Sequence, residues 1–275
     1  MAGSSSEIFA LFGNPVRHSL SPLMHNATFK RMNIDAHYVP FCVKNLEDAV
    51  RGIRGLDIRG VSITIPFKTA VMPYLDEVDE SSLRIGAVNT ILNDDKGCLK
   101  GYNTDWIGLI RDLKESLDMR GKTFAILGAG GAARASVFGI LKEGGIPVIL
   151  NRTVEKGEKM ARDFGCPFYP LSEIGNRKAD CLINTTPVGM NPDRERSPLA
   201  KESLVHFRWV MDIIYNPLKT RLLRDAEEAG CMVLSGAGMF VHQGAEQIKI
   251  WKGVEPPRAF MKQIVLERLK ERDGN

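Results

Sequence analysis

A glycine-rich turn between a short apolar run and an alanine-rich segment constrains this chain more than any other feature. Residues 123–127 predict a buried strand, residues 128–133 follow the pattern Gly-x-Gly-x-x-Ala, and residues 132–142 predict a helix. In this order, the turn lets the backbone approach a pyrophosphate at a helix N-terminus, which is how such turns bind dinucleotides. A purely structural tight turn is the alternative. The residues expected to line the dinucleotide site are Gly128, Ala129, Gly130, Gly131 and Ala132.

The end of the next predicted strand indicates which dinucleotide the turn would bind. An NAD site needs an Asp or Glu roughly 20 residues beyond the turn, where it binds the ribose 2′-hydroxyl. Here residues 147–150 are followed by Asn151, Arg152 and Thr153, and no carboxylate stands there to repel a 2′-phosphate. Arg152 can form a charge-assisted fork with a phosphate, and Lys156 adds a cation one helical turn further on. Thr153 also suits a helix N-cap, and both roles are compatible. We therefore predict NADP rather than NAD.

Short apolar runs alternate with helical patterns along the chain, which predicts a largely parallel α/β fold. The expected strands are 8–12, 36–41, 60–65, 87–92, 98–102, 123–127, 147–150, 181–184, 210–214 and 232–234. The expected helices are 23–32, 46–55, 105–117, 132–142, 154–164, 220–229 and a segment 239–270 broken at Pro256-Pro257. Ser21 is expected to be the N-cap of the first helix, with Pro22 at its first position.

A second α/β series starts afresh at residue 123, which predicts two domains. We expect residues 1–104 and 240–275 to form an N-terminal α/β substrate-binding domain. Residues 105–239 would form a Rossmann-like NADP-binding domain, with a cleft between the two.

Composition and charge narrow the class of protein. The net charge is only +4, and the densest basic stretch, 262–272, contains Glu267 and Glu271, which indicates a solvated helix face rather than a nucleic-acid patch. The five cysteines form no Cys-x-x-Cys pair, which argues against a zinc site and fits a reducing compartment. The sequence shows no leader pattern and no membrane-spanning apolar run. We expect a cytoplasmic protein without metal, nucleic-acid or membrane partners, and either a monomer or a homodimer.

Polar residues recur at the ends of strands predicted in the first domain and at the start of the connecting helix. They are Ser19, Ser21, Thr64, Lys68, Asn89 and Asp105. Ligand sites of open α/β sheets lie at such strand ends. Two hydroxyls at i and i+2 can bind a carboxylate, and a Lys and an Asp brought together can exchange a proton. Each residue alone has a simpler role, since Ser21 and Asp105 suit helix N-caps and Lys68 suits an exposed loop. Only their joint occurrence favours a substrate site.

Motifs spread over nearly the whole chain follow the order typical of one family. They are Gly13-Asn14-Pro15, Ser19-Leu20-Ser21-Pro22 with His25, Thr64-Ile65-Pro66-Phe67-Lys68, Gly86-Ala87-Val88-Asn89-Thr90, Gly101-Tyr102-Asn103-Thr104-Asp105, the Gly128 turn, Asn151-Arg152-Thr153, Asn184-Thr185-Thr186-Pro187-Val188-Gly189-Met190, Asp212-Ile213-Ile214-Tyr215, and Gly238-Met239 with Gln243. In this combination the chain resembles the shikimate dehydrogenases. The resemblance implies reversible, NADPH-dependent reduction of 3-dehydroshikimate to shikimate, in aromatic amino-acid biosynthesis.

The resemblance also implies roles for individual residues. It implies that Lys68 is the catalytic acid/base and Asp105 its partner. The implied substrate ligands are Ser19, Ser21, Thr64, Lys68, Asn89, Asp105, Tyr215 and Gln243. The implied cofactor ligands are Glu80, Gly128, Ala129, Gly130, Gly131, Ala132, Asn151, Arg152, Thr153, Lys156, Ile213 and Gly236. Lys156 stands where the family often has Arg, so the phosphate would lose a fork but keep a charge.

Three other functions compete with this interpretation. A dual quinate/shikimate dehydrogenase tends to use NAD and an acidic residue near the 2′-hydroxyl, which Asn151 contradicts. A non-catalytic NADP-sensing module would be expected to lack one of Lys68, Asn89 or Asp105, and all are present. A methylene-tetrahydrofolate dehydrogenase would not explain Ser19-Leu20-Ser21 together with Asp105.

Overall fold

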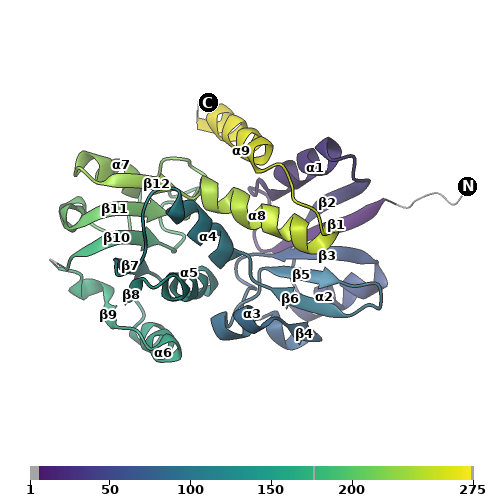
Figure 1. Ribbon diagram of the computed structural model, residues 1–275, viewed down its shortest axis with the longest axis horizontal. Helices are drawn as coiled ribbons and strands as arrows, with labels where there is room; N and C mark the ends of the chain where they lie inside the picture. Colours follow the sequence, from purple (N-terminus) through teal and green to yellow (C-terminus); the bar gives the residue numbers. More distant parts are fainter. Residues whose placement is uncertain (1–5, 176, 274–275) are drawn as a thin grey trace, which may run out of the picture. The chain divides into compact units, whose positions relative to one another are not determined.

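Two compact units make up the chain in the computed structural model, which describes residues 6–175 and 177–273 (Figure 1). The first unit contains residues up to 104 and residues 241–265, and the second contains residues 105–240 and the residues from 266 onward. Residues 266–273 thus group with the second unit, whereas the sequence-based boundaries count them with the first. The assignment of substrate and cofactor binding to separate domains stays a prediction at this point.

The first unit is built on a mixed sheet with the strand order β2-β1-β3-β5-β6-β4 in the described residues. Its strands are β1 (Glu7–Gly13), β2 (Ala36–Cys42), β3 (Ile58–Ile63), β4 (Glu77–Val78), β5 (Thr90–Asn93) and β6 (Leu99–Tyr102). β1 pairs in parallel with β2 and β3, whereas β5 runs antiparallel to both β3 and β6. The short turn between β5 and β6 explains the difference from a parallel sheet, because a tight turn joins only antiparallel neighbours.

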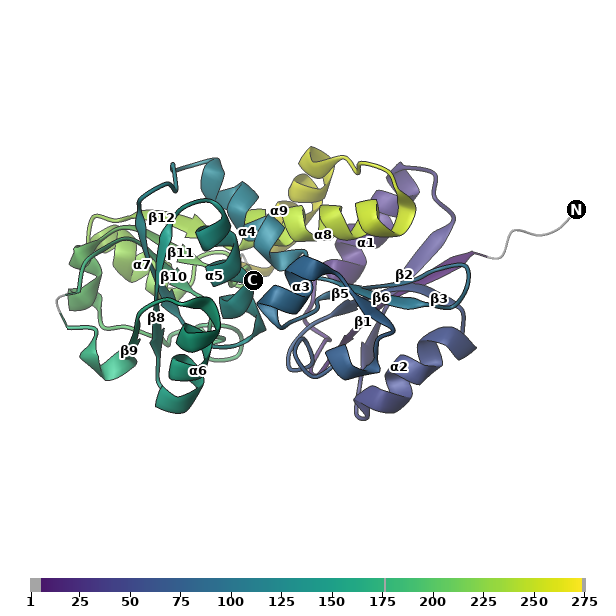
Figure 2. The same cartoon turned by 60° about the horizontal axis from the view of Figure 1, so that its bottom comes forward.

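Helices cover both faces of this sheet. They are α1 (Ser21–Arg31), α2 (Leu46–Gly55), the short α3 (Glu80–Ile85) and, from residue 241, α8 (Ala237–Lys252). α1 and α8 lie on one face and α2 on the other (Figure 2). The alternation of side chains along β1 explains this arrangement. Phe9 contacts the rings of Phe29 and Trp251, at 5.2 and 5.0 Å between centroids, whereas Phe12 packs in the cluster that includes Ile53 of α2.

The second unit is built on a parallel sheet with the strand order β12-β11-β10-β7-β8-β9 (Figure 1). Its strands are β7 (Thr123–Leu127), β8 (Ile146–Asn151), β9 (Phe168–Pro170), β10 (Ala179–Asn184), β11 (Phe207–Asp212) and β12 (Met232–Ser235). The chain runs from β7 to β8 and β9 on one side and then crosses to β10, β11 and β12 on the other. The strand order therefore reverses beside β7, which is where open α/β sheets bind ligands. The expected Rossmann-like fold is confirmed.

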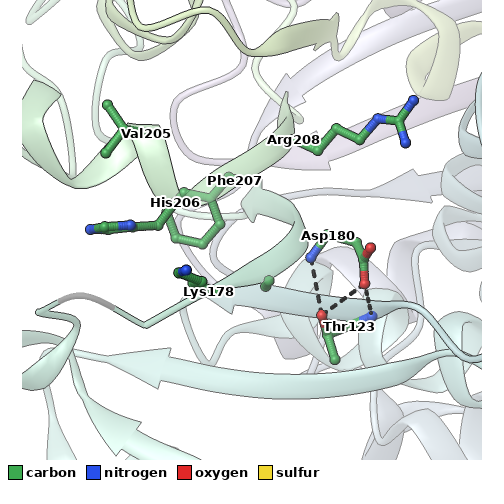
Figure 3. Close-up of a pocket in the computed structure, with 8 residues that line it drawn as sticks. Thr123, Lys178, Asp180, Val205, His206, Phe207 and Arg208 are labelled. Atoms are coloured by element: carbon green, nitrogen blue, oxygen red, sulfur yellow. Dashed lines mark hydrogen bonds between the residues drawn. The ribbon is translucent and has the colours of Figure 1, made fainter.

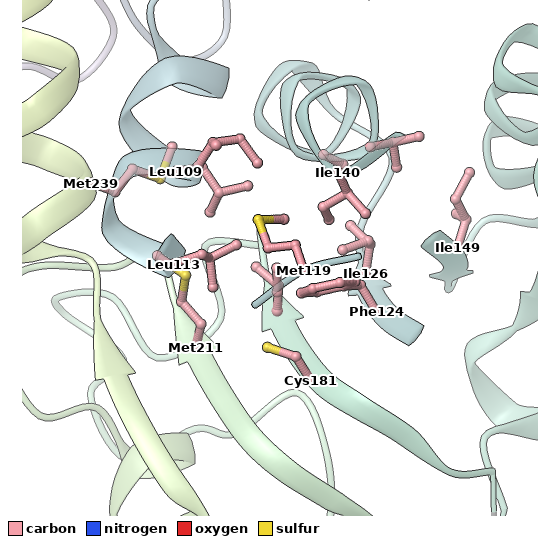
Figure 4. Packing of buried hydrophobic residues seen from close by; sticks show 14 of the residues in the cluster. Leu109, Leu113, Met119, Phe124, Ile126, Ile140, Ile149, Cys181, Met211 and Met239 are labelled. Carbon is pink, nitrogen blue, oxygen red and sulfur yellow. The ribbon is translucent and has the colours of Figure 1, made fainter. Parts of the chain in front are cut away.

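Helices also cover both faces of the second sheet. They are α4 (Asp105–Lys114), α5 (Gly131–Lys142), α6 (Val154–Phe164) and α7 (Arg221–Glu228). The last helix of the described chain is α9 (Arg258–Asp273). Phe124 and Ile126 of β7 pack in a cluster with Ile140 of α5 (Figure 4), whereas Leu127 packs on the opposite face with Leu222 of α7. Among the described residues no helix is both long and apolar enough to cross a membrane.

Several expected element ends were wrong in the first unit. β3 ends at Ile63 rather than 65, and β5 begins at Thr90 rather than 87. The intervening backbone groups bond elsewhere, since Val88 N donates to the Lys68 carbonyl oxygen (2.8 Å) and Asn89 N donates to that of Tyr102 (3.0 Å). These bonds tie the loop that follows β3 to the entry into β5.

The expected N-cap of α1 was also wrong. The helix begins at Ser21 itself, and Leu20 occupies the N-cap position without a side-chain cap. Ser21 therefore lies in the first turn of α1, where both its N–H group and its hydroxyl are at the N-terminus of the helix. Sequence analysis also missed several short elements of six residues or fewer. They are β4, α3, β9 and the 3₁₀ helices η1 (Met72–Tyr74), η2 (Leu171–Glu173) and η3 (Lys201–His206).

Candidate active site

The turn after β7 has the geometry that its glycines predict. Gly128 has φ +116°, in the region that L side chains rarely adopt, and a Cβ there would lie 2.7 Å from Thr185 Oγ1. Its N–H donates to the Leu150 carbonyl oxygen (2.9 Å), which ties the turn to β8. Thr185 Oγ1 in turn donates to the Leu127 carbonyl oxygen (2.6 Å). The turn is therefore fixed from both neighbouring strands, and only glycine fits its first position.

The start of α5 has the features of an anion site. Gly130 is the N-cap of α5, it is exposed, and a Cβ built on it would meet nothing within 4 Å. Gly131 and Ala132 form the half-buried first turn. No acidic residue lies in that turn. The first N–H groups of a helix have no partner within the helix and carry its positive dipole end. An exposed backbone surface of this kind fits a pyrophosphate.

The segment after β8 carries the cations that the sequence analysis assigned to a 2′-phosphate. Asn151 ends β8 and donates from Nδ2 to the Thr153 carbonyl oxygen (2.8 Å). Thr153 is the N-cap of α6, although its side chain makes no cap bond. Arg152 and Lys156 are exposed, and neither takes part in an ion pair with another described residue. Exposed, uncompensated cations at a helix start fit a phosphate better than a hydroxyl.

A buried carboxylate organises the ends of the next two strands. Asp212, at the end of β11, is fully buried and accepts from Asn184 Nδ2 (3.1 Å), Ile214 N (3.1 Å) and Thr220 Oγ1 (2.7 Å). Burial raises the pKa of Asp212 to about 6, although these three hydrogen bonds oppose the shift. Asn184 Oδ1 accepts from Thr186 N (3.0 Å). The network fixes the segments that follow β10 and β11, beside the Gly128 turn. Sequence analysis gave Asp212 and Asn184 no role of their own.

Gly236 shows a second position where the chain needs glycine. A Cβ on Gly236 would overlap the backbone carbonyl of Ile213, so the two segments approach each other directly. Gly236 N donates to the Ile214 carbonyl oxygen (3.2 Å), and Ile213 N donates to that of Asn184 (3.1 Å). Both predicted cofactor residues, Ile213 and Gly236, therefore lie at the carboxyl edge of the parallel sheet.

In the first unit the strand register brings four chain ends to one edge of the mixed sheet. Phe12 pairs with Ile63 near the ends of β1 and β3, and Thr90 at the start of β5 pairs with Tyr102 at the end of β6. β3 and β5 join the two pairs, since Ser62 pairs with Thr90. The residues that follow or precede these ends therefore share the edge. They are Thr64, Asn89 and Thr104, and Lys68 is tied to the entry into β5 through Val88. Ser19 and Ser21 follow β1 at the start of α1.

Ser19 and Ser21 lie together at the start of α1. Ser19 is half-buried and donates from Oγ to Ser21 Oγ (3.1 Å), and it accepts from Ser21 N at the same distance. Ser21 is 7% exposed. Two hydroxyls and the N-terminus of a helix at one point fit a carboxylate.

The loop after β3 is held on both sides. Thr64 N donates to the Phe12 carbonyl oxygen (2.9 Å), and Phe67 N donates to the Thr64 carbonyl oxygen (2.9 Å). At the far end of the loop, the Lys68 carbonyl accepts from Val88 N. Thr64 and Lys68 are both half-buried, so each side chain has solvent access from a fixed backbone.

Asn89 is the most tightly bound of the predicted substrate ligands. It is 2% exposed, and its Oδ1 accepts from Thr104 N (2.7 Å) and Thr90 Oγ1 (2.8 Å). Its Nδ2 donates to Thr104 Oγ1 (2.9 Å). Gln247 of α8 donates to both the Asn89 carbonyl oxygen (3.2 Å) and Thr90 Oγ1 (3.0 Å). Sequence analysis missed Gln247, whose partners Asn89 and Thr90 are 158 and 157 residues away in the chain.

The remaining predicted site residues differ in their burial. Asp105 is buried at the start of α4, directly after Thr104. Tyr215 is half-buried and stacks on Phe240, with 4.1 Å between ring centroids. Gln243 is half-buried in α8, and Glu80 is exposed in the first turn of α3. The roles predicted for these residues remain predictions.

A shallow hollow in the second unit lies away from the predicted cofactor residues (Figure 3). Its lining includes Thr123, Asp180 and Phe207, which stand at the amino ends of β7, β10 and β11. Thr123 N and Oγ1 both donate to Asp180 Oδ2 (2.8 and 2.9 Å). The hollow is at the sheet edge opposite to the Gly128 turn, so it is not the predicted cofactor site.

One unit of the chain is a parallel sheet with a glycine turn that fits a dinucleotide, and the other unit has polar groups at its strand ends. This combination is typical of dinucleotide-dependent α/β oxidoreductases. Residues 11–91 match the shikimate dehydrogenase substrate binding domain, and residues 236–266 match the shikimate 5′-dehydrogenase C-terminal domain. The chain therefore carries both ends of one family's pattern, before and after the segment that forms the parallel sheet.

Full-length relatives extend this match. A shikimate dehydrogenase (NADP(+)) of Geobacillus sp. is 46% identical over 275 residues, covering 96% of this chain and 99% of the relative. A crystal structure of a shikimate dehydrogenase in complex with NADP+ is 39% identical, with a TM-score of 0.89 over 98% of both chains. Another, from Thermus thermophilus in complex with NADP(H) and shikimate, is 35% identical, with a TM-score of 0.86 over 95% of this chain and 99% of the other. The chain belongs to the shikimate dehydrogenase family, and it is an NADP(+)-dependent oxidoreductase acting on a CH–OH group.

Proposed function

We propose that this chain catalyses the reversible reduction of 3-dehydroshikimate to shikimate, with the polar edge of the first sheet as its substrate site. The observation that carries the proposal is the set of polar groups at the strand ends of the first unit, which comprises two hydroxyls at a helix start, a loop lysine and a buried asparagine with a fixed orientation. A substrate with one carboxylate, several hydroxyls and a reacting carbonyl matches those groups in number and kind. The names of the full-length relatives support the same reaction.

On the substrate side, Ser19 and Ser21 bind the carboxylate, with Tyr215 near it. Thr64, Asn89, Asp105 and Gln243 bind the hydroxyls. The assignment of the carboxylate to Ser19 and Ser21 is supported by the N-terminus of α1 at the same point. On the cofactor side, the Gly128 turn with Ala129, Gly130, Gly131 and Ala132 binds the pyrophosphate. Ile213 and Gly236 line the remainder of the cofactor, and Glu80 is assigned a peripheral contact.

The donor set of the second unit fits NADP. The backbone of the turn offers N–H groups without side chains in the way, and Asn151, Arg152, Thr153 and Lys156 offer donors and charge for a 2′-phosphate. When bound, the nicotinamide supplies the hydride. The chain's own task is then to hold the carbonyl carbon in position and to deliver a proton to its oxygen.

Lys68 is the group that we assign to this proton transfer. Its ammonium protonates the oxygen as the carbonyl is reduced and stabilises the negative charge that develops there. In the reverse direction, the neutral amine accepts the hydroxyl proton. Asp105, directly after the bonded Thr104, is its proposed partner and orients it.

Initial rates at 340 nm test the proposal. Shikimate with NADP should give turnover, and the Lys68→Ala variant should lower kcat by roughly 100- to 10,000-fold with little change in KM. The exposed Lys44 provides the control, since Lys44→Ala should retain the full rate. A near-normal kcat in Lys68→Ala would contradict its assignment. Quinate in place of shikimate separates the dual-specificity alternative, and an absence of turnover with any substrate would leave the sensing module.

Three further properties belong to this proposal. The substrate site is assigned to the domain of residues 1–104 and 240–275, and the NADP site to residues 105–239. We also propose that the protein acts in the cytoplasm. It is a monomer or a homodimer, which light scattering coupled to size exclusion distinguishes.

A further inference from the structure

We propose that Gln247 is a positioning residue for the reaction, which fixes the backbone and the side-chain orientation of Asn89. The inference rests on the substrate role proposed for Asn89. Gln247 lies in α8, one helical turn after Gln243, and is 2% exposed. A buried amide is expected to make its hydrogen bonds within the protein, and those of the Gln247 amide nitrogen lead towards Asn89.

The directions of these hydrogen bonds follow from the chemistry of each group. Ser62 of β3 donates from Oγ to Gln247 Oε1 (2.9 Å), which places the amide nitrogen of Gln247 on the side of β5. Gln247 Nε2 then donates to Thr90 Oγ1 (3.0 Å). An amide nitrogen cannot accept, so the Thr90 hydroxyl must direct its own proton elsewhere. It donates to Asn89 Oδ1 (2.8 Å).

Gln247 also holds the backbone of Asn89, because Nε2 lies 3.2 Å from the Asn89 carbonyl oxygen. The side-chain oxygen of Asn89 is thus filled by two donors, Thr90 Oγ1 and Thr104 N. An amide oxygen has two lone pairs, so these two donors fix the orientation of the Asn89 amide. Gln247 secures this arrangement at two points, the carbonyl and, through Thr90, the amide oxygen.

A second hydrogen bond from α8 allows the positioning of Asn89 to be distinguished from the packing of α8 on the sheet. Trp251, four residues after Gln247, donates from Nε1 to the Ile91 carbonyl oxygen (2.9 Å). Both side chains therefore join α8 to β5, but of the two only Gln247 bonds to Asn89. Trp251→Phe is the matched control, since it removes one hydrogen bond between the same two elements.

The first experiment compares Gln247→Met with Trp251→Phe in steady-state kinetics. Loss of Gln247 should raise the KM for shikimate by roughly 3- to 10-fold, the range expected for lost neutral hydrogen bonds. The KM for NADP should stay within about twofold, because the cofactor site is assigned to the other unit. Trp251→Phe should lower the melting temperature and leave the KM for shikimate unchanged. Equal effects of the two variants on that KM, or none from Gln247→Met, would overturn the inference.

The second experiment uses Gln247→Glu, whose behaviour should depend on pH. The introduced carboxyl, when protonated, can still accept from Ser62 and donate to Thr90, whereas its ionised form can only accept. The ionised form would accept the Thr90 hydroxyl proton, which Asn89 Oδ1 would then lose, and its negative charge would repel the Asn89 carbonyl oxygen. Burial raises the pKa of a carboxyl group, so the protonated form persists at low pH and the ionised form appears only as the pH rises. The ratio of the variant's KM for shikimate to that of the wild type, taken at each pH, should therefore rise between about pH 5.5 and about pH 9.

The titratable neighbour does not confuse this result. His25 of α1 is a buried titratable group, and burial lowers its pKa to about 4, so it stays neutral over the range used. A KM ratio near one at every pH would overturn the inference even if Gln247→Met failed to fold. Asn89→Ala separates the two proposals. If it leaves the KM for shikimate unchanged, the substrate role of Asn89 fails, and if it raises that KM while both Gln247 variants do not, only the role of Gln247 fails.

Discussion

Arg152 is the residue to which we assign discrimination between NADP and NAD. It is exposed directly after β8, and it takes part in no ion pair with the described residues. Replacement by Ala should raise the KM for NADP by roughly 10- to 100-fold, the usual effect of losing a hydrogen bond to a charged group. The KM for NAD should change far less, because NAD lacks the 2′-phosphate. Initial rates of shikimate oxidation with each cofactor provide the measurement.

Lys159 provides the control for general charge effects. It is exposed on α6, just under one turn after Lys156. Lys159→Ala should leave the KM for NADP and the KM for NAD within about twofold of the wild type if only contacts at the phosphate matter. Parallel losses with NADP and NAD in Arg152→Ala would refute the role in binding the 2′-phosphate.

At the residue scale, sequence analysis was strongest where a role depends on local chain geometry. Gly128 and Gly130 could be predicted because strand, turn and helix are contiguous, and the structure places them as expected. Gln247 could not, because its partners Ser62 and Thr90 are 185 and 157 residues away in the chain. A hydrogen-bond network between distant elements leaves no periodic pattern in the sequence.

At the element scale, the junction between β12 and α8 depends on Gly236. A Cβ at this position would overlap the Ile213 carbonyl, so Gly236→Ala must move backbone rather than a flexible side chain. We expect a destabilisation of roughly 1–3 kcal/mol, as for overpacked sites. The KM for NADP should also rise, because Ile213 and Gly236 are both assigned to the cofactor. Thermal unfolding and steady-state kinetics check the two effects.

Gly55→Ala is the matched control for that substitution. Gly55 ends α2, and a Cβ there would meet nothing within 4 Å. Alanine favours a helix over glycine, so this variant should melt at or slightly above the temperature of the wild type. A Gly236→Ala variant that melts with the wild type would show that the two segments can separate at no cost.

The same scale explains which elements the sequence predicted. α2 and α6 were expected at their observed bounds, because each presents a clear apolar stripe. β4 and β9 were missed because strands of two and three residues are too short to show alternation. α3 was missed as well, since its six residues make less than two turns, although Asp79 caps it from both oxygens.

At the scale of the whole molecule, the sequence predicted two α/β units but not the mixed sheet of the first. Parallel and antiparallel partners of β3 carry similar apolar residues, so strand composition does not distinguish them. The distinction depends on connection length, which the short turn at 94–98 already signalled. That turn brings Asn89 and Thr104 to one sheet edge, and the substrate site proposed here depends on it.

The two units also contain buried titratable groups of opposite effect on stability. In the first unit, burial lowers the pKa of His25 to about 4, with the ring stacked on Tyr38 and Nδ1 bonded to the Ser21 carbonyl. The unfolded state therefore binds a proton at higher pH than the folded one, and stability is lost as pH falls from about 6.5 to about 4. In the second unit, the raised pKa of Asp212 has the opposite sign, and its protonation below about pH 6 favours the folded state.

Comparison of the wild type with His25→Phe isolates the histidine from Asp212. A shift from 6.5 to about 4 corresponds to about 3 kcal/mol, at about 1.36 kcal/mol per pKa unit. The free energy of unfolding of the wild type, minus that of the variant, should fall by an amount of this order between about pH 7 and about pH 4. The lost bond to Ser21 shifts this difference by a constant, and Asp212 contributes equally to both proteins, so only the slope reports on His25. Urea unfolding at a series of pH values across this range measures it, and a difference that stays flat with pH would mean that His25 is hydrated or compensated in the folded state.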